Sequence, residues 1–246
     1  MSGALEAVLR VDRGAFALDV GLAVAAGSVV ALMGRNGAGK TTAVAALAGL
    51  VPIDAGRVVV DGVVLEDVAA GVSVPPEQRP VGVVQQQAAL FPHLDVRANV
   101  AFGLRTRGMG SREARDRADV LLAEAGLGEF GDRRPSALSG GQAARVALVR
   151  TLAREPALVL LDEPLAAIDA ELRPALRDAV RAQLAGFAGS ALLVTHDVRD
   201  AEALADEVVV LDAGRVVQRG SLAALRRDPT APIVERLLTE TPPVSG

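Results

Sequence analysis

Short apolar runs alternate with helical patterns along most of the chain. The runs are rich in Val and Leu and have the length of buried strands: 29–33, 81–84, 157–161, 191–194 and 208–211. Segments with helical composition or periodicity lie between them, at about 43–48, 171–186 and 199–206. Because buried strands that alternate with helices form a mainly parallel sheet covered on both faces, the pattern predicts an α/β fold.

Two regions depart from this alternation. Residues 8–20 and 54–62 contain short strands bounded by turns, and residues 66–80 are expected to form a loop rich in proline and charge. From 95 to 155 the strand signals disappear, and Ser111 to Ala125 has the pattern of an amphipathic helix. We therefore expect one domain over residues 4–238, with a helical subdomain at about 95–155 inserted in its core. The remaining residues, 239–246, are expected to form a flexible tail.

Composition narrows the function classes. Half of the 246 residues are apolar, which is enough for a sizeable core. The chain has no cysteine, which excludes disulfides, thiol catalysis and Cys-ligated zinc. No apolar run is long enough to span a membrane and the N-terminus lacks a signal-peptide layout, so a cytoplasmic protein is expected. A net charge of −4, with five Phe and no Trp or Tyr, predicts no nucleic-acid partner.

The strongest chemical signal is a phosphate-binding P-loop, G-x-x-x-x-G-K-[ST], at residues 34–41. A predicted strand precedes it and a predicted helix follows it, which disfavours the alternative of a glycine-rich turn that happens to precede a lysine. Lys40, the only lysine in the chain, would reach the β- and γ-phosphates, and the Thr41 hydroxyl would bind Mg²⁺. The predicted phosphate-binding residues are Gly34, Arg35, Asn36, Gly37, Ala38, Gly39, Lys40, Thr41 and Thr42.

Two acidic residues, Asp162 and Glu163, follow the apolar run at 157–161. They lie at the carboxyl end of a predicted strand, where ligands bind in open α/β sheets. Adjacent strand residues point to opposite sides, so the two acids are expected to differ in role. Asp162 would hold Mg²⁺, partly through water, and Glu163 would orient and deprotonate an attacking water. A charged strand end with no ligand is the alternative reading of this pair.

A third motif, Leu138-Ser139-Gly140-Gly141-Gln142, begins a helical segment that Ser139 is expected to cap. Together with the P-loop, Gln86, the LLDEP sequence at 160–164 and Thr195-His196-Asp197, it appears in the order and spacing of one known family. From about Ala4 to Leu238 the chain resembles the ATPase subunits of ABC transporters.

The resemblance implies a P-loop NTPase fold: a RecA-like core, a small antiparallel β portion and an inserted helical subdomain. It also implies a homodimer in which each ATP lies between the P-loop of one copy and the LSGGQ motif of the other. Ser139, Gly140, Gly141 and Gln142 would then bind the γ-phosphate across the interface, and Asp169 would join the two sites. The implied catalytic residues are Glu163, His196, Gln86 and Lys40, and the implied Mg²⁺ ligands are Thr41, Gln86 and Asp162.

The resemblance further implies transmembrane permease subunits as partners, a position on the inner face of the cell membrane, and an extracytoplasmic solute-binding protein in the full system. Segments 74–86 and 90–104 look like those of importers for molybdate, sulfate, spermidine and maltose, so import of molybdate or a similar small solute is expected. A C-terminal regulatory domain, frequent in this group, is expected to be absent or to have been removed.

Three departures from the family pattern bear on activity. No aromatic residue lies about two dozen positions before the P-loop, where the family stacks one on adenine, and Phe16 is the nearest. Gln85 and Ala88 replace the usual aromatic residues around Gln86. Two alternatives therefore stay open: a soluble ATPase of this type that acts on nucleic acid or ribosomes, and a nucleotide switch with little hydrolysis.

Overall fold

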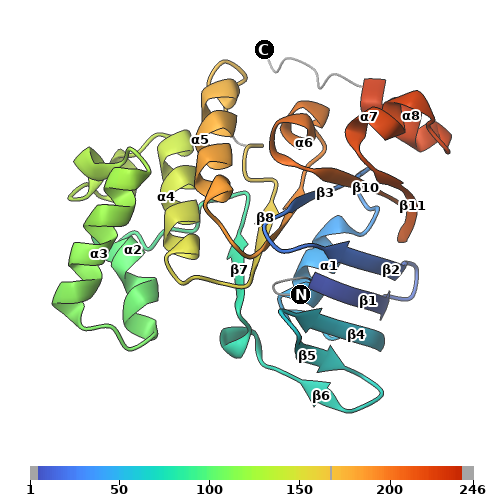
Figure 1. Ribbon diagram of the computed structural model, residues 1–246, viewed down its shortest axis with the longest axis horizontal. Helices are drawn as coiled ribbons and strands as arrows, with labels where there is room; N and C mark the ends of the chain where they lie inside the picture. The colour runs from blue at the N-terminus through green and yellow to red at the C-terminus, as the bar shows by residue number, and fades with distance from the viewer. Residues whose placement is uncertain (1–4, 167, 240–246) are drawn as a thin grey trace. The chain divides into compact units, whose positions relative to one another are not determined.

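The computed structural model describes residues 5–166 and 168–239 (Figure 1). Its internal contacts divide the chain into two compact units. The core unit consists of residues 1–81, 157–163 and 188–246, and the helical unit of residues 82–156 and 164–187. The predicted first residue of the domain, Ala4, and the predicted tail beyond Thr239 lie outside the described residues.

The core unit contains a small antiparallel sheet with the strand order β2-β1-β4-β5-β6 (Figure 1). In β1 every second side chain is buried, beginning with Leu5, because one face of the sheet packs on the core. This sheet confirms the expected antiparallel β portion. Its strands are β1 (Leu5–Asp12), β2 (Ala17–Val24), β4 (Ala55–Val60), β5 (Val63–Asp67) and β6 (Val72–Ser73).

The expectation of a continuous loop over residues 66–80 is wrong. The segment contains the end of β5, the short strand β6 and a 3₁₀ turn, η1 (Pro76–Gln78). The strand signal is hidden because β5 ends on two acidic residues, Glu66 and Asp67. Glu66 is nevertheless buried, and a contact that is distant in sequence, with Arg79, compensates its charge.

The second sheet of the core unit confirms the predicted parallel architecture. Its strands lie in the order β11-β10-β3-β9-β8, with β10, β3, β9 and β8 parallel and β11 antiparallel at the edge. All five residues of β9 are buried, as expected for a central strand covered on both faces. The bounds are β3 (Val29–Gly34), β8 (Leu158–Asp162), β9 (Ser190–Val194), β10 (Glu207–Asp212) and β11 (Arg215–Gly220).

The described part of the core unit contains the helices α1 (Lys40–Leu47), α6 (Val198–Leu204), α7 (Leu222–Arg227) and α8 (Pro232–Thr239). Apolar side chains of α6, α7 and α8 form one cluster with β3 and β10, in which Ala31, Met33 and Leu225 are buried completely. Figure 1 shows α7 and α8 following β11 at the end of the chain. The sequence pattern did not predict β11, α7 or α8.

The helical unit contains a compact group of helices that packs around its own apolar cluster. Ala114, Ala118 and Leu122 form the buried face of α3, as the amphipathic pattern predicts. Asn99 is buried and fully bonded: its side chain accepts from the Phe91 amide and donates to three carbonyls of residues 91–95. The elements are β7 (Val81–Val84, beginning at the unit boundary), α2 (Val96–Thr106), α3 (Ser111–Glu124), η2 (Gly128–Phe130), η3 (Pro135–Ala137), α4 (Gly140–Leu152) and α5 (Arg173–Ala185).

Candidate functional site

The P-loop joins the end of β3 to the start of α1, with Gly34 as the last strand residue and Lys40 as the first helical residue. Two glycines in this turn are sterically required. A Cβ on Gly34 would lie 2.4 Å from the Leu211 carbonyl oxygen, and Gly39 adopts a φ of +107°. A Cβ on Gly39 would also lie 2.8 Å from the Phe16 ring, so this half-buried aromatic side chain lies against the loop.

Lys40 folds back over its own loop. Its ammonium donates hydrogen bonds to the carbonyl oxygens of Gly34, at 2.7 Å, and Arg35, at 3.1 Å, and the residue is 7% exposed. Burial lowers the pKa of Lys40 because it disfavours the charged form, while the nearby carboxylates of Glu163 and Asp162 oppose this shift. The ammonium is therefore held where anionic oxygens of a ligand could replace the two loop carbonyls.

Asp162 is the last residue of β8, at the carboxyl edge of the parallel sheet, and Glu163 follows it directly. Burial raises the pKa of Asp162, the neighbouring Glu163 raises it further, and Lys40 opposes the change. Glu163 has a φ of +50°, which is costly for a residue with a side chain, and its N–H donates to the Val194 carbonyl at 3.0 Å. The backbone holds this carboxylate in a strained position, as is common at functional sites.

His196 is paired with Glu163. Its Nδ1 lies 2.8 Å from Oε1 and 2.7 Å from Oε2 of the carboxylate. The hydrogen bond to Glu163 raises the pKa of His196, and partial burial opposes the shift. The backbone beside the imidazole is fixed, because the Asp197 amide donates to the Thr195 hydroxyl and Asp197 caps α6.

The predicted Mg²⁺ ligands of the core unit are a hydroxyl and a carboxylate, both hard oxygen donors that suit this ion. Thr41 is exposed in the first turn of α1, and Asp162 is half-buried. Within residues 5–166 and 168–239, no group of three or more His, Cys, Asp or Glu side chains could hold a metal ion. Mg²⁺ bound with a nucleotide needs fewer, because phosphate oxygens and water complete its coordination.

A turn far along the chain also contacts the P-loop, which the sequence reasoning missed. The amide of Gly214, between β10 and β11, donates to the Ala38 carbonyl at 3.1 Å, and its carbonyl accepts from the Asp19 amide at 2.8 Å. Gly214 has a φ of +78°, and a Cβ there would lie 1.9 Å from the Ala17 carbonyl oxygen. Gly214 itself was the available signal, since two-residue hairpin turns need positive φ angles that glycine adopts readily.

The other predicted site residues belong to the helical unit, and their roles stay predictions. Gln86 is exposed, two residues after β7. Ser139 caps α4 as predicted: its hydroxyl accepts from the Gln142 amide at 3.3 Å, and the Gln142 side chain accepts from the Ser139 amide at 2.9 Å. Gly140 and Gly141 form the first turn of α4, and the carbonyl of the exposed Asp169 accepts two amides from the start of α5.

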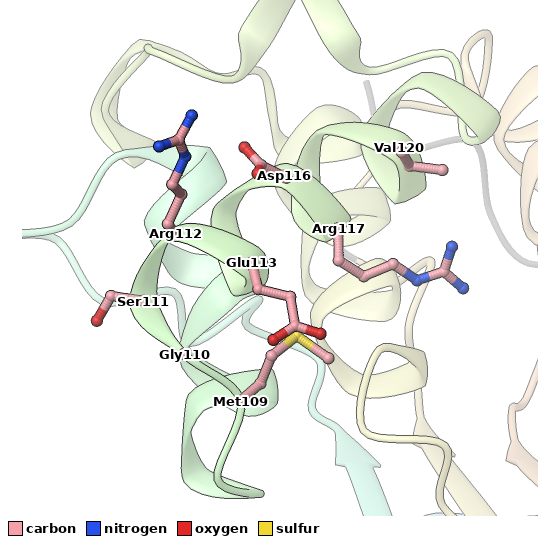
Figure 2. Close-up of a pocket in the computed structure, with 8 residues that line it drawn as sticks. All are labelled: Met109, Gly110, Ser111, Arg112, Glu113, Asp116, Arg117 and Val120. Atoms are coloured by element: carbon pink, nitrogen blue, oxygen red, sulfur yellow. The ribbon is translucent and has the colours of Figure 1, made fainter.

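A surface hollow lies along α3 of the helical unit (Figure 2). Figure 2 shows that its charged side chains come from one helix and have both signs. Arg112, Glu113, Asp116 and Arg117 line it together with Met109, Gly110, Ser111 and Val120. No predicted catalytic or phosphate-binding residue is among them, so the P-loop edge of the core unit is the better candidate site.

Together, β3, the glycine loop, α1 and the acidic edge of β8 define a P-loop nucleotide-binding protein. The sequence pattern of the family described as "ABC transporter" matches residues 18–166, more than half of the chain. The chain therefore belongs to the ABC transporter family. In the part of the chain that the structure describes, no helix has the length and apolar character needed to cross a membrane.

Several curated proteins are similar to this chain. The "Molybdenum import ATP-binding protein ModC" of Mycobacterium tuberculosis is 47% identical over 210 residues, which cover 84% of this chain and 57% of that protein. The "Spermidine/putrescine import ATP-binding protein PotA" of Frankia alni is 44% identical over 218 residues, covering 89% and 44%. The "Fe(3+) ions import ATP-binding protein FbpC 1" of Rhizobium meliloti is 40% identical over 222 residues, covering 90% and 61%. The chain thus spans about half the length of these relatives.

The contact between His196 and Glu163 predicts a pH effect. In Glu163→Gln the pKa of His196 should fall toward the ordinary value of 6.5, because the partner loses its charge. In the unchanged protein, a raised pKa means that the pair stabilises the fold fully below pH 6.5, and that this contribution is lost as the pH rises through the folded pKa. A histidine-labelled NMR titration, with His93→Asn to assign the signals, measures the shift. An unchanged His196 pKa in Glu163→Gln would contradict the assignment.

The close contact at Gly214 predicts a stability difference between two matched turns. Gly62 lies in the turn of the β4–β5 hairpin with a φ of +76°, and a Cβ there would meet nothing within 4 Å. Gly62→Ala should therefore cost about 1–2 kcal/mol for the left-handed backbone alone. Gly214→Ala should cost about 1–3 kcal/mol more, because its Cβ has no room. Denaturant unfolding of both variants measures the difference, and equal losses would show that the contact between Gly214 and the Ala17 carbonyl of β2 is not tight.

Proposed function

We propose that this protein is the ATP-binding and ATP-hydrolysing subunit of an ABC importer. The observation that carries the proposal is the convergence of Lys40, Asp162, Glu163 and His196 on one edge of the core unit, where the pKa of Lys40 depends on both acids. Clusters of perturbed titratable groups at the carboxyl end of a parallel sheet mark functional sites. Family membership and the importer relatives support the same function.

The proposed chemistry gives each of these residues a role in binding or hydrolysing ATP. The amides of the P-loop and the start of α1 bind phosphate oxygens, and Lys40 exchanges its two carbonyl partners for the β- and γ-phosphates. Glu163 accepts a proton from the attacking water, and His196 holds that carboxylate in place and contacts the γ-phosphate. Thr41, Asp162 and Gln86 would hold Mg²⁺, which supplies positive charge to the phosphates when it is bound.

A second copy of the chain would complete each site. The amino end of α4 supports this, because Ser139 and Gly140 are exposed at the positive end of a 13-residue helix. Ser139, Gly140, Gly141 and Gln142 would bind the γ-phosphate of the ATP that is held by the other copy, and Asp169 would connect the two sites. A homodimer with two equal sites is therefore part of the proposal.

Permease subunits in the cell membrane are the proposed partners, with this protein on the inner face and a solute-binding protein on the outer side. The relatives are named for the import of different solutes, so the transported solute depends on those other subunits. Molybdate is the first solute to test, because the molybdenum import relative is 47% identical. Action on nucleic acid or ribosomes, the alternative considered above, has no such support among these relatives.

The proposed chemistry predicts a separation of binding from turnover. Glu163→Gln should bind ATP and hydrolyse it about 10²–10⁴ times more slowly, because it lacks the base. Lys40→Ala should lose binding and serve as the inactive control. Phosphate release is measured with ATP and with GTP, since Phe16 is the aromatic side chain at the loop. If Glu163→Gln hydrolyses ATP at the normal rate, Glu163 is not the base. If the unchanged protein shows no turnover above the Lys40→Ala control, a nucleotide switch is the better explanation.

A further inference from the structure

A buried ion pair lies at the end of α1 opposite to Lys40. The Nη2 atom of Arg79 is 2.6 Å from Oε2 of Glu66, and the two side chains are 1% and 6% exposed. A charge that is removed from water so completely is retained only when charges and hydrogen bonds compensate it. Hydrogen bonds to other groups must therefore stabilise the pair, and these partners lie on three different parts of the core unit.

Arg79 caps the carboxyl end of α1. Its Nη1 donates to the carbonyl oxygens of Ala46, at 3.2 Å, and Leu47, at 3.1 Å, and its Nε donates to the Val74 carbonyl at 2.8 Å. Carbonyls in the last turn of a helix lack partners within the helix, and they carry the negative end of its dipole. A guanidinium satisfies both needs, since it is cationic and carries several donors in one plane.

Glu66 fixes the guanidinium from the other side. Its second oxygen, Oε1, accepts from the Ile53 amide at 3.2 Å, so the carboxylate is bonded on both oxygens. Gly49, just after α1, leaves room for the arrangement: a Cβ there would lie 2.5 Å from Arg79 Nε. The cluster thus connects α1, strand β5 and the segment that enters β7 two residues after Arg79.

We propose that Arg79, held by Glu66, is a positioning residue for phosphate binding by Lys40. The helix between them has only eight residues, about 12 Å, so a fixed carboxyl end also fixes the orientation of the first turn with Lys40 and Thr41. A helix this short is not stable by itself and takes its orientation from tertiary contacts. The inference rests on the proposed nucleotide function, because it concerns the geometry of that same site.

The test separates positioning from stability by removing both charges together. Arg79→Met/Glu66→Gln leaves no uncompensated buried charge, keeps an acceptor for the Ile53 amide and should fold with an unfolding midpoint close to that of the unchanged protein. It also removes the guanidinium from the Ala46 and Leu47 carbonyls, of which the Ala46 carbonyl keeps the Gly49 amide at 3.0 Å. We expect its Kd for Mg·ATP to rise about tenfold, which is the scale of one lost hydrogen bond to a charged group. Arg79→Lys, a point charge that cannot make all four contacts, should give a smaller rise.

The NMR signal of the Lys40 side chain measures nucleotide binding at the site. Because it is the only lysine, a chain labelled with ¹³C or ¹⁵N lysine gives a single side-chain signal from the site, and the chain has no Trp or Tyr for intrinsic fluorescence. The matched control is Arg57→Met/Asp67→Asn, which removes a more exposed ion pair of 3.2 Å in the same sheet, beside Glu66. This control should leave the Kd unchanged.

The outcomes distinguish the two claims. If the Lys40 signal of the unchanged protein does not respond to Mg·ATP, the proposed nucleotide function is wrong. If it responds, and the folded Arg79→Met/Glu66→Gln variant binds as tightly as the unchanged protein, Arg79 has no positioning role. If that variant does not fold, Arg79→Lys decides: a Kd equal to that of the unchanged protein overturns the proposal, and a raised Kd with an unchanged unfolding midpoint supports it.

Discussion

The site depends on one electrostatic constraint, the burial of a single ammonium group in a glycine turn. Lys40 is held by the carbonyls of Gly34 and Arg35. Burial lowers its pKa, and the negative charges of Glu163 and Asp162 oppose that change. A buried cation next to two acids requires anions or dipoles arranged around it. This requirement explains why strand ends, turns and a helix that are distant in sequence meet at this point.

Backbone geometry maintains the arrangement. Close approaches at Gly34 and Gly39 leave no space for a Cβ, and the Gly214 amide donates to the Ala38 carbonyl, so the turn between β3 and α1 is packed against the rest of the core unit. Glu163 is held in the left-handed region, where its carboxylate meets His196. Such strain persists only where the surroundings impose it, and here it orients the group proposed to activate water.

Local patterns predicted much of this structure. The P-loop, the parallel strands, α3 and the Ser139 cap each depend on residues that are near one another in sequence, and each was found where expected. The strands β5, β6 and β11 and the contacts of Gly214 and Arg79 were not predicted. The two contacts depend on partners tens of residues away, Ala38 for Gly214 and Ala46 for Arg79. The strands pair with near neighbours in sequence, but β5 ends on acidic residues, and a buried Glu66 has the local pattern of a loop.

The most direct test of the importer function is the identity of the bound partners. A tagged Glu163→Gln protein, expected to stay loaded with ATP, is purified from gently solubilised native membranes with ATP present. If the importer function is correct, an integral membrane protein copurifies at matching stoichiometry, and the partners of that protein would identify the solute. A soluble complex with ribosomes or DNA, and no membrane protein, would contradict it.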